Sequence, residues 1–248
     1  MSIRIIRLNT LKFVKDFLLA TRLLQIFQPF NRLFGFIYNF NLLTSWVHAH
    51  KKDKMLLNDF YTAVRTYDDR LKSFSSIINN YKLNDTSICY LEFGVFDGRS
   101  FNWWLQNITN ASSRFFGFDT FEGLPEAWGH YYSKGDMSAA MPELNDSRGR
   151  YIKGIFQDTL TDFLKEQGPL LKERKKVIHM DADIFSATLF ALSQLYPFLN
   201  KGDVIMFDEF NVCNHEFMAY RLFTECFYIK LKPISAQGNY YHAAFEVE

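Results

Sequence analysis

The sequence predicts an α/β protein in which helices cover both faces of a mostly parallel sheet. Short apolar runs alternate with helical patterns from residue 87 to residue 226, and such alternation is typical of parallel strands. Two further apolar runs, 228–235 and 241–247, follow each other with only the turn Gln237-Gly238-Asn239 between them. A strand, a short turn and a strand predict an antiparallel edge at the end of the chain.

Taken in order, the elements divide the chain into a helical segment, residues 1–82, and an α/β domain, residues 83–248. Apolar spacing predicts helices over 10–27 and 31–48, which Pro29 separates, and a third helix over 55–82. The α/β domain is expected to run through strand 87–95, helix 100–107, strand 114–119, an irregular stretch to residue 149, strand 151–156, helix 158–167, strand 175–181, helix 186–199, strand 203–208 and helix 215–226.

The composition argues against several classes of protein. The 248 residues carry 28 Lys and Arg against 27 Asp and Glu, a net charge of +1, and this balance gives no sign of a nucleic-acid partner. The three cysteines, Cys89, Cys213 and Cys226, lack the spacing of a metal site. We expect Cys89 and Cys226 to be buried and reduced, which indicates a reducing, cytoplasmic location.

The N-terminal segment is both basic and apolar. Residues 1–40 hold six basic side chains and one acid, Asp16. Pro29 and two glutamines interrupt the apolar run Leu23–Asn31, which is shorter than the ~20 residues that a membrane span needs. Two interpretations stay open for residues 1–45. Their apolar side chains pack on the α/β domain or on a second copy in a homo-oligomer, or they lie in the plane of a membrane surface.

The first expected strand runs into a glycine loop. It ends on the acid Glu92, Gly94 and Gly98 follow, and the next helix begins at Ser100. This arrangement brings backbone close to a nucleotide-like ligand in α/β folds. The G-x-x-x-G spacing is not that of a pyrophosphate loop, so a positively charged ligand without phosphate fits better than NAD. The alternative is an ordinary turn whose helix is capped by Asp97 or Ser100.

The next two strands also end on polar residues. Asp119 follows the second strand, where a carboxylate can accept hydrogen bonds from both hydroxyls of a ribose. Phe156 and Gln157 are expected at the end of the third strand, where a ring and an amide can bracket a purine. Asp158 is better explained as the cap of the following helix.

Acidic residues end the last two parallel strands. Asp181 and Asp183 follow one strand, and Asp208 and Glu209 follow the next. Because adjacent strands lie about 4.8 Å apart, these carboxylates converge, and they repel one another unless a cation intervenes. Oxygen ligands favour Mg²⁺ over zinc. The alternative is helix capping by Asp183 or Ser186 together with a solvated strand end. His215, which begins the following helix, is a candidate base beside this predicted metal site.

Together these residues resemble the class I S-adenosylmethionine-dependent methyltransferases, and within them the macrocin-type O-methyltransferases of the mycinose pathway and related enzymes. The resemblance covers residues 85–248. The resembling stretches, in order, are LEFGVFDGRS at 91–100, FDTFEGLPE at 118–126, GIFQDTL at 154–160, HMDADIFSAT at 179–188 and GDVIMFDEF at 202–210.

The resemblance implies a Rossmann-like, seven-stranded sheet with an antiparallel C-terminal strand, and S-adenosylmethionine as cofactor. It implies that Glu92, Gly94 and Ser100 hold the methionine part, Asp119 the ribose, and Phe156 and Gln157 the adenine. The full predicted cofactor set is Glu92, Gly94, Val95, Phe96, Gly98, Ser100, Asp119, Thr120, Phe156 and Gln157. The resemblance also implies three metal ligands, Asp181, Asp208 and Glu209. Where the family pattern is expected to read Asp-Asp-Tyr, this chain has Asp208-Glu209-Phe210, with a carboxylate one methylene longer and a ring without the hydroxyl.

The implied activity is Mg²⁺-assisted O-methylation of a hydroxylated small molecule, with a sugar as one candidate. The sulfonium already activates the methyl group, so the enzyme aligns an acceptor oxygen and removes its proton. The metal would lower the hydroxyl pKa, and Asp181 or His215 is the expected proton acceptor. The stretch 121–149, which contains several aromatic and methionine side chains, is expected to form a lid over the acceptor.

Two other functions fit parts of the pattern. Asp181-Ala182-Asp183 is a D-x-D of the kind found in nucleotide-sugar glycosyltransferases, but that function leaves Glu92–Gly98 and Asp208-Glu209 unexplained. A catalytically silent methyltransferase-like domain could instead bind a partner or a membrane through residues 1–50. Acids at each expected strand end argue against lost catalysis.

Overall fold

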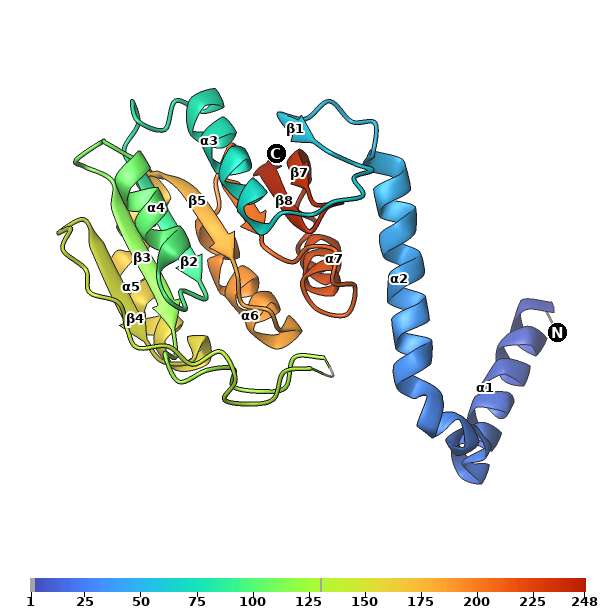
Figure 1. The fold of residues 1–248 in the computed structure, drawn as a ribbon. Helices are drawn as coiled ribbons and strands as arrows, with labels where there is room; N and C mark the ends of the chain where they lie inside the picture. The colour runs from blue at the N-terminus through green and yellow to red at the C-terminus, as the bar shows by residue number, and fades with distance from the viewer. Residues whose placement is uncertain (1–2, 130) are drawn as a thin grey trace.

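One eight-stranded sheet organises the computed structural model, which describes residues 3–129 and 131–248 (Figure 1). The strand order is β1-β7-β8-β6-β5-β2-β3-β4, and β8 runs antiparallel to both of its neighbours while the other pairs are parallel. The strands are β1 (Leu57–Asn58), β2 (Ile88–Phe93), β3 (Arg114–Asp119), β4 (Gly149–Lys153), β5 (Lys175–Met180), β6 (Val204–Phe207), β7 (Leu231–Gln237) and β8 (His242–Val247). The predicted antiparallel edge near the C-terminus is confirmed.

Helices cover both faces of the sheet, as the alternation of strands and helices predicts. The α-helices are α1 (Ile3–Thr21), α2 (Asn31–His50), α3 (Arg70–Asn80), α4 (Arg99–Asn107), α5 (Phe156–Glu173), α6 (Phe185–Leu195) and α7 (Glu216–Phe227). Side chains of α3 and α4 share one core with Ile88 and Tyr90 of β2, whereas α5, α6 and α7 share the other with Leu91 and Phe93. The strand residues alternate between the two cores because successive side chains of a strand point to opposite faces.

The N-terminal helices stand apart from this body (Figure 1). α1 and α2 are joined by a 3-10 helix, η1 (Leu23–Phe30). α2 is anchored to the body from Asn39 onward. Asn39 donates a hydrogen bond to the side chain of Asn214 (2.9 Å), and Trp46 packs edge-on against Phe210 and Tyr240, with ring centroids 4.9 and 5.6 Å away. Among the described residues, no helix has the length and apolarity that crossing a membrane requires.

The predicted helix over 55–82 is wrong for its first part, and α3 at its end is the only α-helix that the structure has in this range. Residues Leu57 and Asn58 form β1 instead, an eighth strand that pairs with β7. Asp59 accepts hydrogen bonds from the backbone N–H groups of Gly238 and Asn239 (2.8 and 3.2 Å). The segment is thus held extended along the sheet edge by tertiary contacts that override the helical spacing. A further 3-10 helix, η2 (Tyr67–Asp69), leads into α3.

Two smaller predictions are also wrong. The strand expected at 151–156 ends at Lys153, because Gly154 turns the chain at φ 139° and α5 begins at Phe156. Phe156 and Gln157 therefore belong to a helix start rather than to a strand end. Cys226, expected to be buried, is exposed near the end of α7, whereas Cys89 is buried as predicted.

Candidate active site

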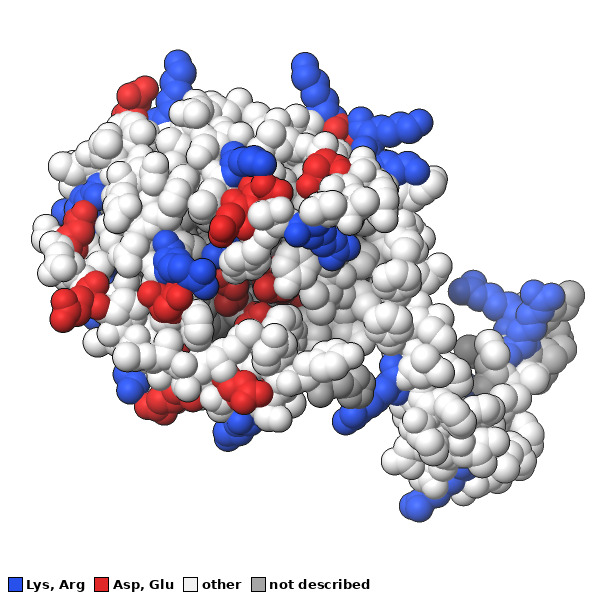
Figure 2. Space-filling model, viewed as in Figure 1, with Lys and Arg blue, Asp and Glu red and all other residues white. Residues whose placement is uncertain are grey.

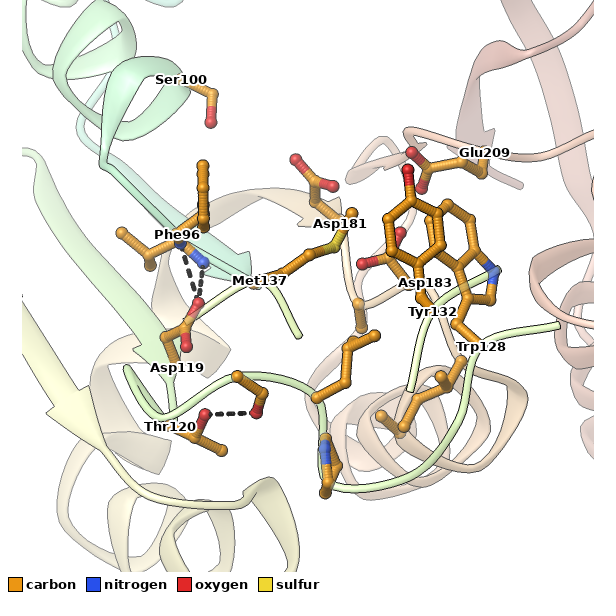
Figure 3. Close-up of a pocket in the computed structure, with 18 of the residues that line it drawn as sticks. Phe96, Ser100, Asp119, Thr120, Trp128, Tyr132, Met137, Asp181, Asp183 and Glu209 are labelled. Carbon is orange, nitrogen blue, oxygen red and sulfur yellow. Dashed lines mark hydrogen bonds between the residues drawn. The ribbon is translucent and has the colours of Figure 1, made fainter. Parts of the chain in front are cut away.

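A cavity of about 340 Å³ lies beyond the carboxyl ends of β2, β3 and β5, the position where α/β sheets bind ligands. Its size suits a small-molecule ligand. In the space-filling view, acidic side chains are recessed in a hollow on this face (Figure 2). The close-up shows Asp181, Asp183 and Glu209 grouped on one side of the cavity and Phe96 and Asp119 on the other (Figure 3).

The glycine loop packs directly against the end of β5. The backbone N–H of Gly94 donates a hydrogen bond to the carbonyl of Phe118 (2.8 Å), and the backbone N–H of Asp181 donates one to the carbonyl of Phe93 (2.9 Å). Gly94 has φ 98°, and a Cβ added there would lie 1.7 Å from the carbonyl oxygen of Asp181. Only glycine fits this approach. The loop and the acidic strand end are therefore built as one unit.

Glu92 is fully buried behind the loop and is not among the described residues that line the cavity. Its Oε1 accepts a hydrogen bond from the Ser100 hydroxyl (2.7 Å), and its Oε2 accepts one from the Tyr90 hydroxyl. Ser100 does line the cavity. The structure thus gives Glu92 a positioning role toward Ser100, and a direct contact with the cofactor stays a prediction.

The Asp119 carboxylate, at the end of β3, holds the glycine loop by hydrogen bonds. Its Oδ2 accepts hydrogen bonds from the backbone N–H groups of Val95 and Phe96 (2.7 and 2.8 Å), as Figure 3 shows, and its Oδ1 accepts one from Phe121 (2.7 Å). Thr120 donates to the carbonyl of Gly123 (2.8 Å). Asp119 lines the cavity, so one carboxylate both shapes the loop and faces the ligand space.

The remaining cofactor-set residues are divided between cavity and core. Gly94, Val95, Phe96, Thr120, Phe156 and Gln157 line the cavity. Phe156 is largely buried and packs edge-on against Phe93, with centroids 5.2 Å apart. Gly98 lies outside the lining, at the start of α4 with φ 78°. Ile155 also lines the cavity and was not predicted.

Three carboxylates meet on the far side of the cavity. Oxygen atoms of Asp181, Asp183 and Glu209 all lie within 4.8 Å of one another. Glu209 Oε2 is buried without a hydrogen-bond partner in the described part of the chain. Burial and the charge of Asp208 raise the pKa of all three, that of Asp183 to about 7. An orphaned oxygen among crowded carboxylates fits a hard divalent cation such as Mg²⁺.

Asp208 is placed differently from the other predicted metal ligands. Its Oδ1 accepts a hydrogen bond from Arg70 (2.8 Å), and its Oδ2 accepts one from the Tyr67 hydroxyl (2.9 Å). Burial alone would raise its pKa, but contacts with His179 and His242 and the charge of Arg70 hold the pKa of Asp208 well below its usual range. Asp208 is therefore paired with protein groups and is not among the described residues that line the cavity, whereas Asp183 is. Asp208 also forms a second candidate metal group with His179 and Asp181, so its role as a metal ligand stays a prediction.

Arg70 and Tyr67 are functional-site residues that the sequence patterns did not reveal. Both line the cavity although they precede the predicted α/β domain. The Arg70 guanidinium stacks 4.0 Å from the Tyr67 ring centroid and lies 3.5 Å from Asp181. Their acidic partners Asp181 and Asp208 are more than one hundred residues away along the chain, so no local spacing signals the contacts.

His215 and the predicted lid stand differently toward the cavity. His215 is not among the described residues that line the cavity, and its Nδ1 accepts a hydrogen bond from the backbone of Phe185 (3.3 Å). Trp128, Tyr132 and Met137 of the predicted lid do line it, and the rings of Trp128 and Tyr132 stack at 4.9 Å. Tyr131 and Met141 belong to the same stretch, but they are exposed and are not among the described residues that line the cavity.

The region around this cavity is similar to known methyltransferases. A family model described as a methyltransferase domain matches residues 91–210. The crystal structure of CalS11, a calicheamicin methyltransferase, superposes with a TM-score of 0.56 at 18% identity, over 85% of this chain and 91% of that one. An apo structure of CalS11, described as a TDP-rhamnose 3'-O-methyltransferase, gives 0.51 at 20% identity, over 85% and 93%. The O-methyltransferase NovP gives 0.49 at 19% identity, over 72% and 79%. No curated protein matches.

Proposed function

We propose that this chain is a class I S-adenosylmethionine-dependent methyltransferase that transfers the methyl group to a hydroxyl oxygen of a small molecule, as supported by the methyltransferase-domain match over residues 91–210. The observation that carries the proposal is the single cavity that joins the glycine loop to the cluster of Asp181, Asp183 and Glu209. A sugar is the favoured acceptor, as supported by the described activity of one structural neighbour on TDP-rhamnose. Membership of the macrocin-type family belongs to the same proposal.

The cofactor would lie along the glycine loop, with its methionine end toward Ser100 and its ribose toward Asp119. Both residues line the cavity, and the nearby carboxylates suit the positive charge of the sulfonium. Phe156 and Gln157 would border the adenine from the start of α5. The loop needs no phosphate contact, in agreement with its lack of a pyrophosphate pattern.

The acceptor hydroxyl would bind beside the acidic cluster, under the rings of Trp128 and Tyr132. Mg²⁺ held by Asp181, Asp183 and Glu209 would lower the pKa of that hydroxyl and fix its position. Methyl transfer forms the O–CH₃ bond, breaks the S–CH₃ bond and leaves a neutral thioether, while the hydroxyl proton passes to a carboxylate. Asp183 is the favoured acceptor of the proton, because its carboxylate faces the cavity beside the proposed position of the hydroxyl. Asp181 and His215 are the alternatives.

Substrate and metal are tested together by turnover. Formation of S-adenosylhomocysteine would be followed with a panel of nucleotide-linked and free sugars, with Mg²⁺ or with excess EDTA. We expect turnover with at least one hydroxylated sugar and a loss of most of the rate in EDTA, restored by Mg²⁺. Full activity in EDTA would contradict the metal proposal alone. Turnover of UDP-sugars without methylation would favour the glycosyltransferase interpretation.

Substitution of Gly94 by alanine tests the loop geometry. The added Cβ would meet the Asp181 carbonyl at 1.7 Å, and an unfavourable φ alone costs roughly 1–3 kcal/mol. We expect a lower melting temperature and at least tenfold weaker binding of S-adenosylhomocysteine. Gly35→Ala is the matched control, because a Cβ at Gly35 in α2 has open space, and alanine there should stabilise by up to about 1 kcal/mol. Equal affinity of the Gly94→Ala variant and the wild type would refute this geometry.

The N-terminal helices bear on the proposed partners other than the acceptor. No described residue of 1–45 lines the cavity. We propose a homo-oligomer or a peripheral membrane contact as the partner of this segment. Residues 1–40 carry a net charge of +5. This charge attracts an anionic membrane surface and repels the same segment of a second copy.

A further inference from the structure

The N-terminal helices present an apolar surface that is exposed in the described part of the chain. On α1, η1 and the first part of α2, large hydrophobic side chains such as Phe13, Ile26 and Phe40 are exposed, Phe13 and Ile26 to 72% and 71%. No described residue of η1 is buried. Contiguous exposed apolar surface of this kind marks an interaction site.

The most apolar part is the junction between the two helices, which we define as the tip, residues 23–34. Figure 1 shows α1 and α2 meeting there, away from the sheet. Leu23–Asn31 carries no charged side chain, and Arg22 and Arg32 flank it. The ring centroid of Phe34 lies 6.3 Å from that of Phe27 and 6.2 Å from that of Phe30. The tip therefore presents a cluster of three packed aromatic rings.

The charge of this region is opposite to that of the remainder. Residues 1–40 hold six basic side chains and one acid, a net of +5, so the other residues hold 22 basic against 26 acidic, a net of −4. The one acid, Asp16, lies 3.6 Å from Lys15. Figure 2 shows this end of the molecule as mainly uncharged, with basic side chains around it.

We infer that the tip inserts into the surface of an anionic membrane, with Arg22 and Arg32 at the level of the lipid phosphates. Basic residues that flank an apolar segment too short to span are typical of interfacial anchors. Symmetric pairing of two copies through this surface would bring a net of +5 against +5. Charge complementarity therefore favours anionic lipid over a second copy of the chain.

Vesicle co-sedimentation of the full-length protein tests the inference. We expect wild type to sediment with vesicles of phosphatidylcholine and phosphatidylserine, to bind pure phosphatidylcholine more weakly, and to be partly released by high salt. Arg22→Gln with Arg32→Gln should weaken binding to the anionic vesicles by on the order of 25-fold, at roughly fivefold per charge. Ile26→Gln with Phe27→Gln should weaken binding to both vesicles by tenfold or more.

Val64→Gln with Tyr228→Gln is the matched control, because these side chains are also exposed but lie outside the N-terminal helices. This variant should bind like the wild type. All variants should have the same melting temperature as the wild type, since each changes only exposed side chains. The inference is overturned if wild type stays in the supernatant with anionic vesicles, or if the tip variant sediments like wild type. It is also overturned if light scattering shows a dimer that the tip variant dissociates while no vesicle binding occurs.

Discussion

Replacement of Asp183 by asparagine is expected to lower kcat by about 10²–10⁴-fold, the usual contribution of a positioned general base. Asp183 has φ 60°, a conformation that asparagine also tolerates, so the backbone should be unchanged. The amide has the size of the carboxyl group but cannot take the proton of the acceptor hydroxyl. The measurement is single-turnover formation of S-adenosylhomocysteine.

The stability of this variant separates a catalytic role from a structural one. The Asp183 charge raises the pKa of Asp181 and of Glu209, so its removal relieves repulsion and the melting temperature should stay or rise. Asp162→Asn, which changes an exposed acid on α5, should leave kcat unchanged. A kcat of Asp183→Asn within twofold of the wild type would show that another group takes the proton.

Replacement of Arg70 by methionine is expected to destabilise the fold by about 3–5 kcal/mol, the cost of removing one partner of a buried ion pair. Arg70 is largely buried, lies 2.8 Å from the buried Asp208 and also contacts Asp181. Methionine preserves much of the side-chain volume but leaves Asp208 without its guanidinium. Denaturant unfolding measures the effect.

Lys72→Met on the same helix is the control for Arg70. Lys72 pairs with Asp69 at 2.6 Å but is 70% exposed, and such surface pairs contribute only about 0–1 kcal/mol. The double variant Arg70→Met with Asp208→Asn should recover part of the loss, because it removes the buried unpaired charge. A loss below 1 kcal/mol for Arg70→Met would mean that Arg70 does not hold Asp208 in place.

The sheet was predictable because its strands are short apolar runs with polar ends. The strand expected at 114–119 matches β3 in full, and β2 and β5 differ from prediction by a few residues at most. The predictions failed where one residue or one distant contact decides the conformation. Gly154 ends β4 early, and β1 forms because β7 is available to pair with it. Neither effect is visible in apolar spacing.

The site was predictable in location and only partly in detail. Strand-end acids indicated the carboxyl edge of the sheet, and most of the predicted cofactor set lines the cavity there. The roles within the cluster depend on pairings across the fold. Asp208 is held by Tyr67 and Arg70, more than one hundred residues earlier, while Asp183, assigned to helix capping as an alternative, faces the cavity at φ 60°.

The central claim, that the cavity along the glycine loop binds the cofactor, is tested most directly by calorimetric titration of S-adenosylhomocysteine into the wild-type protein. We expect one binding site per chain, with an affinity that is unchanged in Gly35→Ala and at least tenfold weaker in Gly94→Ala. The absence of binding of either S-adenosylhomocysteine or S-adenosylmethionine by a folded wild-type protein would contradict it.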